Sequence, residues 1–261
     1  MDRREKIARL AQTKEDEVLL ARVYERITLA AQRNVPASTC FLSKREQMLC
    51  QELLRGEDFR FFGGTELSER EVCCYLPEYL DESWLTGDEG PIAAVRAVYF
   101  AGDTLTHRDF LGALMGCGIR REAVGDLCLQ PRQCDLFVTA ELAPYLLDNL
   151  TSAGRAHLTL TRIAPSQADR PPQTLQELRV SVSSPRLDSV ISAAFHLSRG
   201  SAADAVAAGR VNLNDLPCLK PDRAVQENDT VSVRGLGKLR VLALGGLTKK
   251  GRLALTLGKY L

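Results

Sequence analysis

This 261-residue sequence lacks the segments that mark membrane and secreted proteins. No apolar run approaches the ~18 residues of a membrane-spanning helix. The opening stretch, MDRREK, is mostly charged and has no apolar core of the kind found in signal peptides. We therefore expect a cytoplasmic protein that does not contact a membrane.

Metal-binding spacing is missing as well. The eight cysteines include no C-x-x-C pair and the chain has only three histidines, so the pattern of a zinc site is absent. Most cysteines have apolar neighbours, as Cys128 does between Leu127 and Leu129, where a thiol behaves as a small hydrophobic group. We predict reduced, structural cysteines and no bound metal.

Signatures of catalysis are equally scarce. The sequence contains no nucleophile elbow and no glycine loop for a cofactor. His107-Arg108-Asp109 has the order of a protein-kinase catalytic loop, but the asparagine that should follow it is missing. Thr106 and Asp109 are better explained as a helix start. We predict no catalytic residue and no cofactor.

Charge is unevenly distributed along the chain. Hydrophobic residues make up 45% and charged residues 26%, as in ordinary globular proteins, and the net charge is only +1. Residues 180–261, however, contain 12 Lys and Arg against 6 Asp and Glu, a net charge of +6, whereas residues 1–179 contain 22 against 27, a net charge of −5. Such asymmetry indicates a C-terminal end that binds a polyanion.

The first third of the chain is expected to be helical. Helix formers fill residues 13–33, and Asn34 with Val35-Pro36 ends that helix. Ser43 and Glu46 have the spacing of a capping box at the start of a second helix. The aromatic run at 59–64 is interpreted as a hydrophobic plug against the next domain, with a platform for base stacking as the alternative.

The next segment predicts an α/β domain. Strands are expected at 70–76, 94–100, 124–129, 133–138 and 156–163, and helices at 106–117 and 140–150. From residue 94 the order is β-α-β-β-α-β, the pattern of a ferredoxin-like sandwich such as the RNA-recognition motif (RRM). Its strands lack the basic and aromatic residues with which RRMs stack bases. A strand at 175–182 is expected to be added to this domain.

A helix pair follows. Ser184 can cap a first helix, whose buried stripe consists of Leu187, Val190, Ile191 and Ala194. Ser198 caps a second helix that ends at Gly209, and the dipole and unpaired backbone N–H groups at its start favour phosphate beside Arg199. Strands at 210–214, 230–233, 239–244 and 253–257 complete a small sheet with a basic turn at 249–252.

This segment resembles the αL motif of the RNA-binding domain named after small-subunit ribosomal protein S-four. The matching residues, in the same order and spacing, are Arg186-Leu187-Asp188, Ser198-Arg199, Ala202, Gly209, Val211 and Asn212. The sequence departs from the motif at Ala203-Asp204 and at 213–215, where basic residues are common in that family. Fewer phosphate contacts, and weaker or more narrowly placed binding, are therefore expected.

From about residue 43 onward the chain resembles the bacterial YlmH family. The segments that match are 62–64, 105–114, 118–122, 125–126, 182–184 and 246–252. The resemblance implies an α+β fold with a helical N-terminal region (1–68), a central RRM-like, ferredoxin-like α/β sandwich (69–179) and a C-terminal S-four-type αL domain (180–261). It also implies a non-enzymatic RNA-binding protein associated with the large ribosomal subunit and stalled peptidyl-tRNA, historically linked with cell-division gene clusters.

We therefore predict a monomer that binds rRNA or tRNA on the ribosome. Asp188 is expected to orient an arginine or to support the helix dipole rather than to contact RNA itself. The candidate RNA-binding residues are Arg186, Ser198, Arg199, Ser201, Arg210, Asn212, Lys249, Lys250, Arg252, Arg108, Arg120 and Arg121.

Two other functions remain open. One is an RNA-modifying enzyme, such as a pseudouridine synthase, that uses the S-four-type domain to hold its substrate. In those enzymes the module usually precedes a larger catalytic domain, whereas here it is C-terminal. The other is a division scaffold with incidental RNA affinity.

Overall fold

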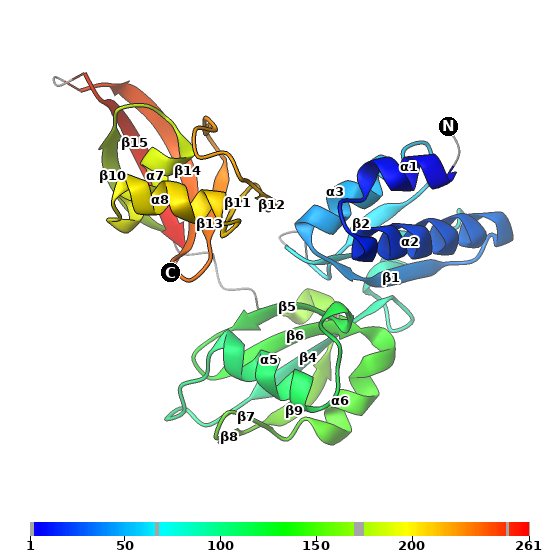
Figure 1. Cartoon of the computed structure of the whole chain (residues 1–261). Helices are drawn as coiled ribbons and strands as arrows, with labels where there is room; N and C mark the ends of the chain where they lie inside the picture. The colour runs from blue at the N-terminus through cyan, green and yellow to red at the C-terminus, as the bar shows by residue number, and fades with distance from the viewer. Residues whose placement is uncertain (1–2, 66–67, 170–174, 249–250, 261) are drawn as a thin grey trace. The chain divides into compact units, whose positions relative to one another are not determined.

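The computed structural model describes residues 3–65, 68–169, 175–248 and 251–260. Both units combine helices with antiparallel sheets, so the predicted α+β class is confirmed (Figure 1). The chain divides into two compact units, Met1–Pro171 and Pro172–Leu261, and the first unit contains the segments for which we predicted two domains. The domain boundaries at 68/69 and 179/180 stay predictions.

The first unit begins with helices packed on a small sheet. Its elements are α1 (Arg3–Leu10), α2 (Lys14–Arg33), β1 (Ala37–Leu42), α3 (Lys44–Leu53), β2 (Arg60–Phe62) and β3 (Glu71–Tyr75). Reciprocal capping boxes join Thr13 with Asp16 and Ser43 with Glu46, which confirms the two predicted helix starts. The strands are antiparallel in the order β1-β3-β2.

Two features of this sheet differ from the sequence analysis. Strand β1 was not predicted, and β3, which we expected to belong with the following α/β segment, instead pairs with β1 and β2. Both faces of β3 are buried, because Cys73 packs toward the helices and Val72 and Cys74 pack toward the next sheet. A strand buried on both faces has no alternation of polar and apolar residues that would reveal its partner.

A four-stranded sandwich completes the first unit. Its elements are α4 (Ser83–Thr86), β4 (Ile92–Val98), α5 (His107–Gly116), β5 (Val124–Leu129), β6 (Gln133–Thr139), α6 (Ala143–Asn149), β7 (Ser152–Ala153), β8 (Ala156–His157) and β9 (Thr159–Ile163), with 3-10 turns η1 (Arg121–Ala123), η2 (Ala140–Leu142) and η3 (Pro165–Gln167). The antiparallel order β5-β6-β4-β9, with α5 and α6 over one face, is the predicted ferredoxin-like arrangement (Figure 1).

The other face of this sheet is covered by the N-terminal layer. Phe137 and Ala94 pack with Phe41 and its neighbours on β1 and β3 in one buried cluster. Gly64 is pressed against the Phe137 ring, where an added Cβ would lie 2.4 Å from a ring carbon, and its φ is +95°. Within the aromatic run at 59–64, Phe62 packs into the cluster shared with the sandwich, as the hydrophobic plug predicts. Phe59 and Phe61 instead pack into the cluster under the N-terminal helices.

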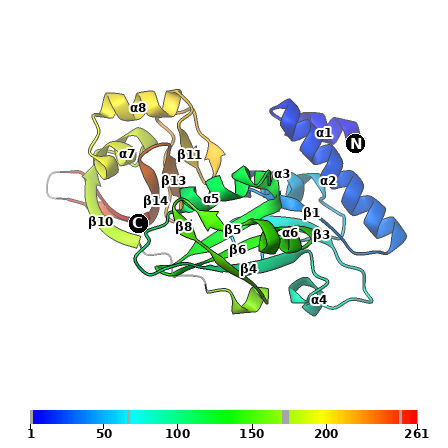
Figure 2. The ribbon, with the colours of Figure 1, turned by 90° about the horizontal axis from the view of Figure 1, so that it is seen from below.

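The second unit is a sheet with a helix pair. Its elements are β10 (Leu175–Val182), α7 (Leu187–Phe195), α8 (Arg199–Ala207), β11 (Val211–Leu213), β12 (Leu216–Pro217), β13 (Thr230–Val233), β14 (Gly237–Leu247) and β15 (Leu253–Tyr260). The strands are antiparallel in the order β10-β15-β14-β13-β11-β12. Helices α7 and α8 lie beside each other on the curved sheet (Figure 1, Figure 2), and the predicted apolar stripe of α7 is buried.

Two predictions for this unit are wrong. The strand at 175–182 pairs with β15 from Leu175 opposite Tyr260 onward, and so adds to this sheet rather than to the sandwich. Helix α7 begins at Leu187, and its N-cap is Arg186 rather than Ser184. The carbonyl of Arg223 accepts a hydrogen bond from the Leu187 N–H at 2.8 Å. A distant backbone carbonyl therefore replaces a capping side chain as the acceptor for an N–H group at the start of the helix.

Candidate nucleic-acid interface

The candidate site in the second unit is built around one buried carboxylate. Asp188 is 3% exposed and lies in the first turn of α7. Arg186 donates to it from Nε at 3.2 Å and from Nη2 at 2.9 Å, and the Ser189 hydroxyl donates at 3.2 Å. The Nε atom of Arg199, at the start of α8, lies 3.5 Å from the same carboxylate. Asp188 therefore joins arginines from both helices, and the expected orienting role is confirmed.

The electrostatics of this cluster keep Asp188 and Arg186 charged. Burial alone would raise the pKa of Asp188, but hydrogen bonds from Arg186 and Ser189 outweigh it and hold the pKa below its ordinary value of 3.8. The same carboxylate raises the pKa of Arg186. The side chains of Arg186 and Arg199 remain 39% and 54% exposed, so two partly exposed cations share one buried anion, and Asp222 also acts on Arg186.

The start of α8 adds to this surface. The Ser198 hydroxyl accepts the backbone N–H of Ser201 at 3.0 Å, which confirms the predicted cap. The two hydroxyls also share a hydrogen bond of 2.8 Å. The partial positive charge of a helix N-terminus favours phosphate, and Arg199 is the first residue of this helix.

The other predicted residues of this unit have different surroundings. Arg210 is exposed after the left-handed Gly209, whereas Asn212 is half-buried opposite Ser232 in the sheet. Arg252 is exposed, but its guanidinium donates to the Ser181 carbonyl at the end of β10. Lys249 and Lys250 lie outside the described residues.

Arg223 is a candidate that the sequence analysis did not include. Its side chain is exposed, and its backbone carbonyl accepts from the start of α7. A β-bridge between Arg186 and Ala224 brings this loop beside the Asp188 cluster. The signal was the basic pair in the segment KPDR at 220–223, but nothing local in the sequence ties that loop to α7.

The three candidate arginines of the sandwich do not form one group. Arg108 is exposed in the first turn of α5, and Arg120 and Arg121 follow the other end of this ten-residue helix, which is about 15 Å long at 1.5 Å per residue. Arg120 pairs with Glu122 at 3.0 Å. Arg121 donates to the carbonyls of Val124 and Gly125, so it is held against its own backbone.

The face of the sandwich that RRMs use for stacking bases is closed. Besides the apolar cluster under β1 and β3, a polar network covers it. Asp135, fully buried, accepts from Arg96 at 2.8 and 2.7 Å and from the backbone N–H of Asp169 at 2.7 Å. This agrees with the lack of stacking aromatics in the sequence, and any RNA contact of the sandwich must lie elsewhere.

Two aspartates could have served an enzyme as catalytic groups, but both accept hydrogen bonds from backbone N–H groups. Asp109 accepts from the backbone N–H of Thr106 at 2.8 Å in the predicted capping box, and Asp126 accepts from those of Glu69 and Arg70 at 2.8 and 3.1 Å. Among the described residues no group of three His, Cys, Asp or Glu is placed to hold a metal. The described chain also has no helix long and apolar enough to cross a membrane.

Comparisons with known proteins bear on both units. A family model described as "Putative RNA-binding domain in YlmH" matches residues 98–167. "Ribosome-associated protein quality control protein P2" of Bacillus subtilis (strain 168) is 31% identical over 220 residues, which cover 84% of this chain and 85% of that protein. The chain belongs to the YlmH family.

A solved structure shows the fold of this family. "Cell division protein ylmH from Streptococcus pneumoniae" matches with a TM-score of 0.50 and 18% identity, over 61% of this chain and 98% of that one. The stretch at 98–167 that matches the family model contains α5, β5, β6, α6 and β9 and includes Arg108, Arg120 and Arg121. The Asp188 cluster of this YlmH-family chain lies outside that stretch.

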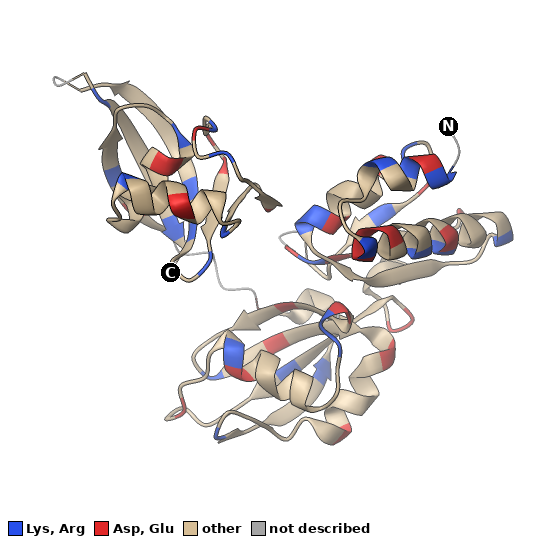
Figure 3. Ribbon diagram, in the orientation of Figure 1, with Lys and Arg blue, Asp and Glu red and all other residues tan. Residues whose placement is uncertain are grey.

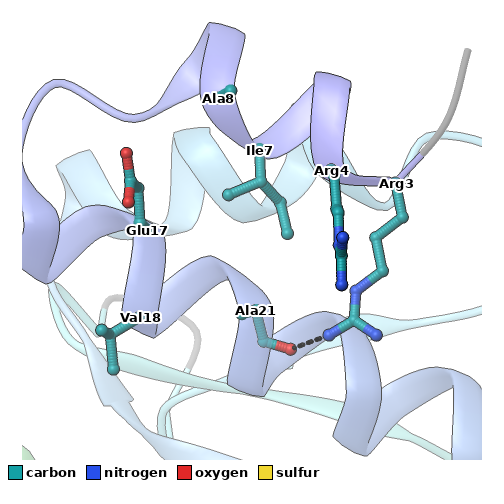
Figure 4. Close-up of a pocket in the computed structure, with 7 residues that line it drawn as sticks. All are labelled: Arg3, Arg4, Ile7, Ala8, Glu17, Val18 and Ala21. Carbon is teal, nitrogen blue, oxygen red and sulfur yellow. Dashed lines mark hydrogen bonds between the residues drawn. The ribbon is translucent and has the colours of Figure 1, made fainter.

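Charged residues of this YlmH-family protein are not confined to one surface. Figure 3 shows acidic and basic residues interleaved along α1 and α2, and both acidic and basic residues on the second unit, including its helix pair. A groove of about 520 Å³ separates α1 from α2 (Figure 4). There Arg3 donates to the Ala21 carbonyl at 3.0 Å and lies 5.0 Å from the Tyr24 ring centre, and Glu17 lines the same groove. This mixture of charges does not select an anion.

Proposed function

We propose that this YlmH-family protein binds structured RNA through its second unit, acting as an S-four-type αL domain, and that it catalyses no reaction. The observation that supports this most directly is the Asp188 cluster. A buried anion holds two partly exposed guanidiniums at the capped start of α8. Guanidinium groups bind phosphate with paired N–H donors, so two of them at a helix start suit an RNA backbone.

The surrounding residues extend this surface. Ser198 and Ser201 position the first turn of α8, and the exposed Arg210 follows the same helix. We propose Asn212 and Arg252 as further contacts, together with Lys249 and Lys250, which lie outside the described residues. Contacts of this kind fix the position of an RNA backbone without reading its sequence.

The proposed target is the ribosome. The B. subtilis relative is named for ribosome-associated protein quality control, which supports rRNA and tRNA as the RNA that is bound. We propose that a cytoplasmic monomer engages the large subunit carrying stalled peptidyl-tRNA. Arg108, Arg120 and Arg121 would make separate, weaker contacts, because α5 holds Arg108 apart from the other two.

Binding of a structured RNA hairpin by the full-length protein tests this function. Arg199→Ala should weaken the binding at least tenfold and make its dependence on salt less steep, because each lost phosphate contact removes about 0.9 from the slope of log K against log salt. Arg179→Ala, which removes an exposed arginine from β10 of the same unit, is the matched control and should bind as wild type does. Equal affinities for Arg199→Ala and wild type would contradict the proposal.

Ribosome association and the absence of catalysis are tested separately. The wild-type protein should co-sediment with large subunits, and Arg199→Ala should be largely lost from that fraction. RNA incubated with the protein should contain no new modified nucleotide by mass spectrometry. A modified nucleotide would instead support the RNA-modifying enzyme.

A further inference from the structure

A cavity of about 550 Å³ lies within the first unit and shares no residue with the Asp188 cluster. Helix α2, strand β1, the start of α3 and the turn after α5 supply its walls. The basic residues that line it are Arg22, Arg26, Arg70, Arg120 and Arg121. They come from separate parts of the sequence and meet only in the folded unit.

Two of these arginines are fixed at the inner wall. Arg70 donates from Nε to the Val124 carbonyl at 3.0 Å and from Nη2 to the Phe41 carbonyl at 2.9 Å. Arg121 also donates to the Val124 carbonyl. Burial lowers the pKa of both guanidiniums, and the charge of Arg70 lowers that of Arg121 further. Two cations thus converge on one carbonyl, and within the described chain neither forms an ion pair.

Two more cations stand on α2. Arg22 and Arg26 are one helical turn apart, so their side chains leave the same face, and neither is buried. No carboxylate among the described residues lies within ion-pair distance of either. They are free to turn toward a ligand in the cavity.

Nearby carboxylates offset only part of the charge of these four arginines: Glu46 and Asp126 act on Arg70, and Asp126 acts on Arg121. Glu46 accepts from the backbone N–H of Ser43 at 2.6 Å and from its hydroxyl at 2.7 Å in the capping box of α3. Glu122 pairs with Arg120 at the rim. Four guanidiniums around one space, none of them ion-paired with a carboxylate of the described chain, attract an anion with several oxygens, such as a phosphate group.

The remaining wall is partly apolar and leaves room for more than phosphate. Leu19 lines it with the nearly fully buried Val23 and Leu42, beside Thr39, Cys40 and Ser43. A volume of about 550 Å³ is within the usual range for small-molecule sites, roughly 300–1,000 Å³. A flat heterocycle can lie against such a wall while its phosphate meets the arginines. We propose that this cavity binds a single nucleotide, its phosphate held by Arg22, Arg26 and Arg70 and its base against the partly apolar wall.

The nucleotide has two possible sources with the same chemistry: a free mononucleotide, or an unpaired residue at the end of an RNA strand. The full-length protein should be titrated by calorimetry with GMP, with inorganic phosphate, and with a short single-stranded RNA that has a terminal phosphate. GMP should bind at least tenfold more tightly than inorganic phosphate. Tighter binding of the RNA than of GMP would assign the site to a strand end, and the reverse would assign it to a free nucleotide.

The variants use residues that the fold does not need. Arg22→Ala combined with Arg26→Ala should weaken GMP binding at least tenfold with an unchanged melting temperature, because neither side chain is buried on α2. Arg33→Ala, exposed on the last turn of the same helix, is the matched control and should bind normally. Arg199→Ala should also leave GMP binding unchanged, which separates this site from the proposed αL function. Unchanged GMP affinity in the double variant, or equal affinity for GMP and inorganic phosphate, would overturn the nucleotide site.

Discussion

Substitution of Asp188 by asparagine separates two explanations of the αL cluster. The asparagine would keep the shape of the side chain but remove the negative charge that pairs with Arg186 and Arg199. If only net charge governed RNA affinity, the variant, with one negative charge fewer, would bind RNA more tightly. If Asp188 positions the two guanidiniums, the variant should bind about five- to tenfold more weakly, which corresponds to about 1–1.4 kcal/mol of binding free energy.

The same substitution should destabilise the second unit by a modest amount. A hydrogen bond to a charged group contributes about 1.5–3 kcal/mol, but both arginines are more than a third exposed and water screens the interaction. We therefore expect a loss of about 1–2 kcal/mol in the free energy of unfolding. In a unit of this size each kcal/mol lowers the melting temperature by roughly 4–8 °C.

The pH dependence of this effect has a definite sign. The pKa of Asp188 is lower in the folded protein than its ordinary value of 3.8, so its stabilising effect is present above that pH. It is lost as the pH falls below 3.8 through the folded-state pKa. Urea unfolding should therefore show a difference between wild type and Asp188→Asn at pH 7 that shrinks as the pH falls below about 4.

The assay is RNA-binding anisotropy of the full-length protein at fixed salt, with Asp204→Asn as the matched control. Asp204 is on α8 and is not buried, and its substitution changes the net charge equally without touching the cluster. The control should bind RNA as tightly as wild type or slightly more tightly. Tighter binding by both variants would refute a positioning role for Asp188.

Three further predictions concern the fold. Leu187→Ala, which truncates a fully buried side chain, should cost about 2–5 kcal/mol in denaturant unfolding, and a loss below about 1 kcal/mol would show that this position is not in the core. Gly64→Ala should cost about 1–3 kcal/mol by the same measurement because its Cβ would meet Phe137; wild-type stability would argue against that close packing. Burial raises the pKa of Cys50 and Cys74 to about 12, so native labelling with N-ethylmaleimide at about pH 7.5, followed by mass spectrometry, should spare both until the protein is denatured; rapid labelling would contradict their burial.

Much of the local structure could be predicted because its determinants are close in sequence. The capping pairs Thr13 with Asp16 and Thr106 with Asp109 are three residues apart, and each starts a helix where the sequence analysis expected one. The β-α-β-β-α-β order followed from strand and helix periodicity alone. In the αL segment, Ser198 caps α8 and Asp188 holds its neighbour Arg186, both over short distances along the chain.

The tertiary structure alone decided which distant segments meet. Strand β10 pairs with β15, and β3 pairs with β1. The sequence could not predict these pairs, because the backbone groups that form the hydrogen bonds are the same in nearly every residue. The backbone N–H of Leu187 at the start of α7 donates to the carbonyl of Arg223, in a loop far along the chain, and no local capping rule can predict this hydrogen bond. Arg120 and Arg121 were predicted from the sequence only as RNA contacts, and packing of β1 against the η1 turn places them beside Arg22 and Arg26 of α2. Composition shows how many arginines a chain has; only the packing of buried apolar faces determines which of them share a cavity.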